Sequence, residues 1–194
     1  MEKREVFGLL AKQFKTPQEV VTEIINLQAI LNLPKGTEHF LSDLHGESET
    51  FLHILRNASG VIRTKIDLAF GSDLSEGEKN DLAALIYYPE RVLKKYETAE
   101  DKKERYAGIL IRLIEVTKLV AAKYTRSKVR KALPKDYQYI IDELINMPHH
   151  SIDKKDYYNH IISSIIELGN AENFICEMCR LIQRLAIDHL HIVG

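Results

Sequence analysis

The sequence predicts a mostly α-helical protein with two short β-strands and a large helical insertion between them. Three observations support this: apolar residues recur at helical spacing over most of the chain, caps and prolines divide that pattern, and two short alternating segments interrupt it. The chain has 194 residues, 45% of them hydrophobic and 28% charged. That composition is typical of a globular protein, so one compact unit with its own core is the simplest expectation.

Capping residues mark where the predicted helices begin. Residues 16–19, Thr-Pro-Gln-Glu, place an N-cap, a proline at the first helical position and a reaching glutamate ahead of an amphipathic segment that runs to Leu31. Residues 75–78, Ser-Glu-Gly-Glu, repeat this logic, and Gly71 closes the helix before them. The further helices that we expect are 101–133 with Pro134 as its stop, 136–147, 154–168 closed by Gly169, and 171–185.

The two segments that break the helical pattern are residues 38–43 and 186–193. Both are short and partly alternating, and glycine or turn residues bound them, which predicts strands. A helical stretch of roughly 140 residues separates them, and an isolated strand pair is only marginally stable. We therefore expect that helices are inserted into a larger sheet, or that part of the sheet lies elsewhere.

Charge and hydropathy exclude several classes of function. The net charge of -1 gives no general attraction to nucleic acid or to membranes. The apolar run Phe7–Ala11 is too short for a signal peptide core, and no run approaches the roughly 20 residues of a membrane span. We expect a cytoplasmic protein that binds neither nucleic acid nor membrane.

The two cysteines, Cys176 and Cys179, are three residues apart inside a predicted helix. Redox pairs with this spacing usually open a helix after a strand, so the pattern favours buried structural thiols.

The residues that carry chemistry follow the first predicted strand. In the sequence Ser-Asp-Leu-His-Gly-Glu, residues 42–47, Asp43 and His45 are two apart, so on an extended backbone both side chains point the same way and Leu44 points away. A carboxylate with an imidazole suits Mn²⁺, Fe²⁺ or Zn²⁺, and Gly46 would let a phosphate approach the next helix. The alternative is that Asp43 caps that helix and His45 is a polar turn residue.

Two further groups of polar residues are weaker candidates. A basic cluster either grips a substrate or effector phosphate or forms a solvated helix face. Its members are Lys123, Arg126, Lys128, Arg130 and Lys131. His189 and His191 share one face of the second predicted strand and are interpreted as strand-end polar residues, while His149 and His150 are expected in a loop.

Residues 42–47 resemble the first metal motif of the calcineurin-like metallophosphoesterases. The stretches 26–40, 123–136 and 181–194 are similar to class III fructose-1,6-bisphosphatases in particular. The similarity covers nearly the whole chain but only about the first third of such a family member. Ser48 stands where an aromatic residue is expected, which is a minor departure.

The resemblance implies a complete enzyme that hydrolyses fructose 1,6-bisphosphate to fructose 6-phosphate and phosphate by a two-metal mechanism. Asp43 and His45 would bind the first of two Mn²⁺ ions, and no catalytic residue is assigned. The two strands would belong to the α/β metallophosphoesterase sandwich. Residues 1–46 would hold the N-terminal helices and the first catalytic strand, 47–185 a crossover with a helical insertion, and 186–194 the second catalytic strand.

In that family the glycine matching Gly194 begins a second motif, Gly-Asp-x-x-Asp-Arg-Gly, whose first aspartate bridges both metals. We therefore expect residues 1–194 alone to bind metal weakly and to be inactive. Two alternatives stay open: a phosphoprotein phosphatase with the same first motif, and a non-catalytic helical module for assembly or regulation. For the insertion, a cap, an effector site and a subunit contact within a homo-oligomer all remain open.

Overall fold

The computed structural model describes residues 3–96, 100–147 and 154–193, and it divides into two units, one up to Lys35 and one from Gly36 onward. The first unit holds helices α1 (Lys3–Gln13) and α2 (Pro17–Ile30). The second holds β1 (Glu38–Ser42), α3 (Ser48–Asn57), α4 (Val61–Phe70), α5 (Glu76–Tyr87), α6 (Pro89–Leu93), α7 (Lys102–Ala121), α8 (Arg126–Ala132), α9 (Gln138–Ile145), α10 (Lys155–Glu167), α11 (Ala171–Ala186) and β2 (His189–Val193). Short 3-10 turns lie at Ala58–Gly60, Lys94–Tyr96 and Lys135–Tyr137. None of the helices in the described ranges combines the length and the apolar composition that a bilayer span requires.

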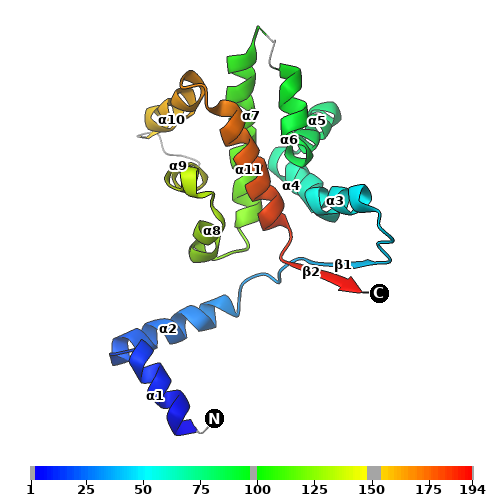
Figure 1. Cartoon of the computed structure of the whole chain (residues 1–194). Coiled ribbons are helices and arrows are strands. Elements are labelled where there is room, and N and C mark those ends of the chain that lie inside the picture. The colour runs from blue at the N-terminus through cyan, green and yellow to red at the C-terminus, as the bar shows by residue number, and fades with distance from the viewer. Residues whose placement is uncertain (1–2, 97–99, 148–153, 194) are drawn as a thin grey trace. The chain divides into compact units, whose positions relative to one another are not determined.

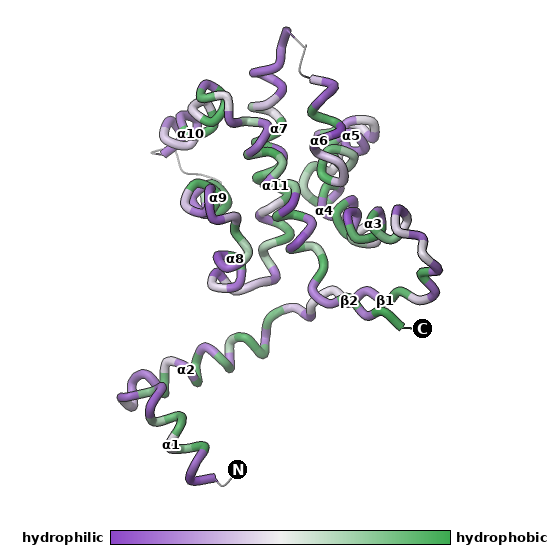
Figure 2. Tube along the Cα trace, viewed as in Figure 1, coloured by the Kyte–Doolittle hydropathy of each residue, from purple (hydrophilic) through white to green (hydrophobic). Residues whose placement is uncertain are grey.

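The first unit confirms the predicted cap and shows helices without a core. The Glu19 backbone N–H donates to Thr16 Oγ1 at 3.2 Å, and Pro17 occupies the first helical position. Apolar and polar residues alternate along α1 and α2 (Figure 2), yet neither helix buries a residue. On the predicted amphipathic face, the side chains of Ile24 and Leu27 are about half exposed.

In the second unit, α7 and α11 lie side by side at the centre. Helices α8 to α10 lie on one side of this pair and α3 to α6 on the other (Figure 1). Helix α11 buries ten of its sixteen residues, which places it inside the core rather than on its surface. The largest fully buried side chains are Ile62, Ile66, Ile86, Leu110, Leu113, Ile141, Leu144, Phe174, Ile175, Met178, Leu181 and Ile182.

Side-chain caps begin α2, α5 and α8, and the sequence analysis missed the last of these. The capping box is confirmed, because the Ser75 N–H donates to Glu78 Oε2 at 3.0 Å and the Glu78 N–H donates back to Ser75 Oγ. The single helix predicted over 101–133 is wrong. Thr125 adopts an extended conformation there and accepts a hydrogen bond from the Lys128 N–H, so the chain leaves α7 and starts α8.

Both cysteines lie on α11 as free, buried thiols, which confirms the prediction of a structural role. Burial raises the pKa of the Cys176 thiol, and it raises the pKa of Cys179 still further above its ordinary value. A thiol held in the protonated form is a poor nucleophile, so neither residue has the character of a redox cysteine.

The two strands form a parallel pair, in register from Glu38 opposite His189 to Ser42 opposite Val193. The second strand is shorter than predicted, because α11 continues through Ala186. On β1 the side chain of His39 is buried, and its Nδ1 forms a 2.8 Å hydrogen bond with Ser59 Oγ. Since the strands are parallel, their carboxyl ends meet at one edge of the sheet, just before Asp43.

Candidate metal centre

The loop after β1 is built from residues with left-handed backbone conformations. The φ angles are 52° at Asp43, 44° at His45 and 78° at Gly46. The prediction that extended backbone aligns the two side chains is therefore wrong, because β1 ends at Ser42 and the chain turns at once. Aspartate and histidine are among the few non-glycine residues that tolerate this region, and such strain in a native structure is typical of functional loops.

Asp43 and His45 nevertheless approach each other. Asp43 Oδ1 lies 3.9 Å from His45 Nε2, and their side chains are 73% and 80% exposed. With metal–ligand bonds of about 2.1 Å, two atoms bound to one ion lie at most about 4.2 Å apart, so this pair fits a single divalent ion. In the described ranges no group of three or more His, Cys, Asp or Glu side chains gathers around a metal-sized position. A divalent ion bound here would need at least four ligands, and the pair would supply two of them.

The alternative role for Asp43 as a helix cap is wrong. The N-cap of α3 is Glu47, and its side chain makes no capping hydrogen bond in the described structure. The Gly46 Cα faces open space, since a Cβ built there would have no neighbour within 4 Å. The Gly46 Cα is thus unobstructed on the side where a side chain would lie.

A buried aspartate that the sequence analysis did not single out lies at the opposite end of the strand pair. The Asp188 side chain is 2% exposed, and its Oδ2 accepts from Lys123 Nζ at 2.5 Å and from the Thr37 backbone N–H at 2.8 Å. Lys128 Nζ lies 3.3 Å from Oδ1. We call Thr37, Lys123, Lys128 and Asp188 the Asp188 cluster. In the sequence, Asp188 is an aspartate between the end of a helix and a strand. Such aspartates are common in surface loops, so the sequence gives only a weak signal for this cluster.

The charges of the Asp188 cluster hold the aspartate ionised. Burial alone would raise the pKa of the Asp188 carboxyl, but the hydrogen bonds from Lys123 and from the Thr37 N–H outweigh it and keep that pKa well below its usual range. The ring of Tyr124 lies beside both ammonium groups, 5.0 Å from Lys123 Nζ and 4.2 Å from Lys128 Nζ.

The structure separates the five residues of the basic cluster. Lys123 and Lys128 pair with Asp188, and the Arg130 guanidinium pairs with Asp142 at 2.9 Å. Within the described residues, neither Arg126 nor Lys131 forms an ion pair. The five cations therefore do not converge on one position, and phosphate binding by them stays a prediction.

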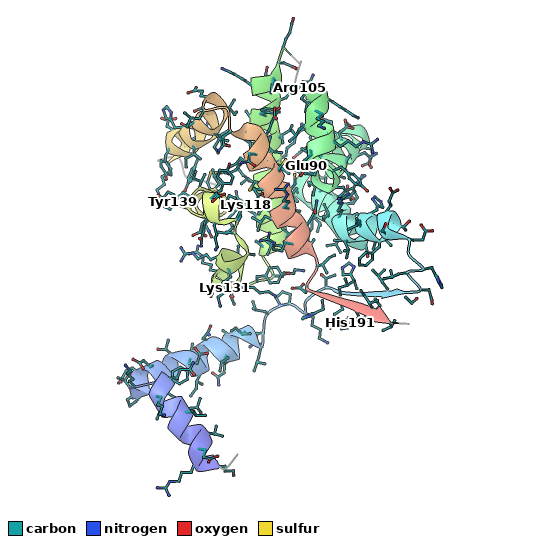
Figure 3. The ribbon with its side chains drawn as sticks, in the orientation of Figure 1. Glu90, Arg105, Lys118, Lys131, Tyr139 and His191 are labelled. Carbon is teal, nitrogen blue, oxygen red and sulfur yellow. The ribbon has the colours of Figure 1, made fainter. Side chains whose placement is uncertain are left out.

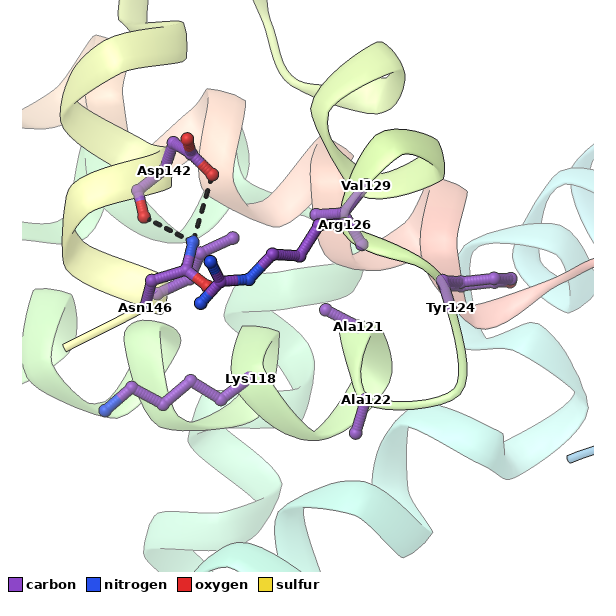
Figure 4. Close-up of a pocket in the computed structure, with 9 residues that line it drawn as sticks. Lys118, Ala121, Ala122, Tyr124, Arg126, Val129, Asp142 and Asn146 are labelled. Carbon is purple, nitrogen blue, oxygen red and sulfur yellow. Dashed lines mark hydrogen bonds between the residues drawn. The ribbon is translucent and has the colours of Figure 1, made fainter. Parts of the chain in front are cut away.

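Arg126 lines a cavity of about 190 Å³ between α7, α8 and α9. Figure 4 shows its guanidinium extending toward Asn146, whose side-chain amide donates to Asp142 Oδ1 at 3.0 Å. Lys118 also lines this cavity, but Glu115 accepts from its Nζ at 2.7 Å.

The histidines of β2 lie on the outer face of the strand pair. His191 (labelled in Figure 3) stacks on Phe40 with ring centroids 4.5 Å apart, and its Nε2 is 3.6 Å from Glu38 Oε2. The ring of His189 is 6.5 Å from that of His191, so the two share a face as expected. The predicted loop histidines His149 and His150, and the motif glycine Gly194, lie outside the described residues.

Comparison with known proteins gives one consistent result. A family model described as Firmicute fructose-1,6-bisphosphatase matches residues 5–194. The class 3 fructose-1,6-bisphosphatase of Clostridium acetobutylicum is 56% identical over 190 residues, and that of Alkaliphilus metalliredigens is 58% identical over 187. Each match covers 96% of this chain but only 28% of the relative, so the chain spans just over a quarter of their length. No solved structure matches. The chain belongs to the Firmicute fructose-1,6-bisphosphatase family.

Proposed function

We propose that this chain is part of a manganese-dependent enzyme that hydrolyses fructose 1,6-bisphosphate to fructose 6-phosphate and phosphate. The observation that carries the proposal is the family match over residues 5–194, whose curated relatives are named for this activity. The chain spans 28% of those relatives, so the activity is proposed for the whole protein and not for residues 1–194 alone.

In this proposal Asp43 and His45 hold the first metal ion. Their oxygen and nitrogen donors suit Mn²⁺, and their exposure leaves both atoms free to bind it. When bound, Mn²⁺ supplies Lewis-acid activation of water and neutralises charge on the phosphoryl oxygens. The left-handed turn at residues 43–46 holds the two side chains outward, and the absence of a side chain at Gly46 leaves space for the phosphate.

We further infer that β1 and β2 are strands of the metallophosphoesterase sandwich, with the helices from α3 to α11 as crossover and insertion. Parallel strands are normally covered on both faces, yet Phe40 is 65% exposed and Ile192 is 58% exposed. That exposure supports a sheet that extends beyond the pair described here. Arg126, the first residue of α8, lines the cavity between α7, α8 and α9 and is the remaining candidate for a phosphate contact.

The substrate is tested with the intact protein that contains this chain. With Mn²⁺ present, we expect hydrolysis of fructose 1,6-bisphosphate and none of a phosphoserine peptide; the reverse preference would establish a phosphoprotein phosphatase. Asp43→Ala should lower kcat/KM by at least about 100-fold, since even residues that only support a metal ligand cost 10–100-fold. Asp73→Ala, which changes an exposed carboxylate in the turn after α4, is the matched control.

The metal site is tested separately with residues 1–194. We expect weak Mn²⁺ binding that Asp43→Ala abolishes and no turnover of fructose 1,6-bisphosphate, because two ligands do not complete a metal site. Turnover by residues 1–194 would refute the incomplete site. If residues 1–194 still bind manganese and the intact protein is still active after Asp43→Ala, the loop has no metal role.

A further inference from the structure

We propose that Asp188 is a positioning residue for the Asp43–His45 metal pair, because it fixes the register between β1 and β2. This inference rests on the proposed function for the metal role of that pair. The register itself is observed, and the contacts that set it lie at the amino ends of the two strands.

Asp188 contacts the two residues that precede β1, Gly36 and Thr37, through its side chain and its backbone. Its carboxylate accepts from the Thr37 N–H, while the Thr37 carbonyl accepts from the backbone N–H groups of Asp188 at 3.2 Å and His189 at 3.1 Å. Gly36 packs against the same side chain, since a Cβ there would lie 2.9 Å from Asp188 Cγ. The residue before β1 and the residue before β2 are therefore tied to each other by backbone and side chain together.

Two lysines from the helical part of the unit also bind Asp188. Lys123 follows the end of α7 and donates to both Asp188 Oδ2 and Thr37 Oγ1, the latter at 3.1 Å. Lys128 reaches Asp188 from α8. A buried carboxylate thus joins the sheet to the helical core, and its hydrogen bonds to charged groups are stronger than neutral ones.

The register set at the amino ends of the strands also determines which residues lie together at their carboxyl ends. With Glu38 opposite His189, the pairing carries Ser42 opposite Val193, so Asp43 follows directly after the last residue pair of the two strands. A slip of one residue would turn every side chain of one strand to the other face of the sheet and would separate Asp43 from the end of β2. The Asp188 cluster is the buried contribution to this register, because β2 is exposed along its whole length and the Phe40–His191 stack and the His191–Glu38 pair lie on the exposed face.

The test uses residues 1–194 and the variant Asp188→Asn, which keeps an acceptor for the Thr37 N–H but removes the charge. Amide hydrogen exchange in 38–42 and 189–193 should become about tenfold faster, while amides of α7 and α11 keep their protection. Glu172→Gln is the matched control. Glu172 accepts from Tyr106 at 2.7 Å and pairs with Lys102 at 2.8 Å, at the far end of α11, and its loss should leave the strands unchanged.

Manganese alone is the second probe. In the unsubstituted chain, paramagnetic Mn²⁺ should broaden the amide signals of Ser42 and Val193 together, and Asp188→Asn should change the ratio of the two broadenings, because a slip of one residue moves Val193 by about 3.3 Å relative to Ser42. A purely stabilising role would leave this ratio unchanged. If Mn²⁺ broadens neither signal, the metal proposal fails. Amide hydrogen exchange in the two strands then still decides whether Asp188 sets the register.

If amide hydrogen exchange in the strands is unchanged in Asp188→Asn, or if strands and helices lose protection equally, the positioning role is overturned. If Asp188→Asn does not fold, Lys128→Met carries the same comparison, because the Lys128 side chain is 59% exposed and its loss leaves no cavity. A Lys128→Met chain with unaltered strand exchange and unaltered broadening at Val193 would likewise overturn the proposal.

Discussion

Gly36 and Gly108 should respond in opposite directions to replacement by alanine. A Cβ on Gly36 would meet three atoms of Asp188, Cγ at 2.9 Å, Cβ at 3.0 Å and Oδ2 at 3.1 Å. Asp188 has no freedom to move aside, since Lys123 and the Thr37 N–H hold its carboxylate. The Gly108 Cα lies inside α7 and faces open space, with no atom within 4 Å of an added Cβ.

The magnitudes follow from these distances. Ordinary contacts of a methyl group begin near 3.4 Å, so Gly36→Ala requires a shift of a few tenths of an ångström in a tightly packed cluster and should cost about 1–3 kcal/mol. Gly108→Ala removes a flexible residue from a helix interior and should stabilise the protein by about 0.5–1 kcal/mol.

Urea unfolding followed by far-ultraviolet circular dichroism measures both changes, provided that the transition slope stays constant. For a chain of this size, each kcal/mol also shifts Tm by about 2–4 °C. A Gly36→Ala protein as stable as the unsubstituted chain would refute the close packing of Gly36 on Asp188. A destabilised Gly108→Ala protein would show that the α7 surface at this point is covered.

Three further predictions follow from single contacts. Neither Cys176 nor Cys179 should react with a thiol reagent at pH 8 in the native chain and both should react in urea, because burial raises both pKa values; fast native labelling would contradict their burial. Ser75→Ala should destabilise the chain by about 1 kcal/mol in urea unfolding, since it removes the cap of α5, and an unchanged midpoint would refute the capping role. The pKa of Asp188 is lower in the folded state than its unfolded value of 3.8, so its stabilising contribution is complete above about pH 5 and is lost as the pH falls below 4. The unfolding free energy should therefore drop between pH 5 and pH 2 by on the order of 2 kcal/mol more in the unsubstituted chain than in Asp188→Asn, and equal acid dependence would contradict the ionised cluster.

Much of the helical architecture was readable from the sequence because its causes are local. The caps at Thr16 and Ser75 and the stop at Gly169 depend on contacts within three or four residues, and the structure confirms all three. The single helix predicted over 101–133 was wrong for a related reason. Apolar periodicity continues across Thr125, so the pattern gave no sign of the extended cap that separates α7 from α8.

The sequence by itself determined the predominance of helix, the two strand segments, the motif at Asp43 and His45, and the resemblance that the family match then confirmed. Only the tertiary structure decided the parallel register of β1 and β2, the left-handed turn that orients Asp43 and His45, and the pairing of Lys123 and Lys128 with Asp188. The physical reason is sequence separation. Thr37 and Asp188 are 151 residues apart, and a contact of that span depends on how the whole helical core folds rather than on any local pattern.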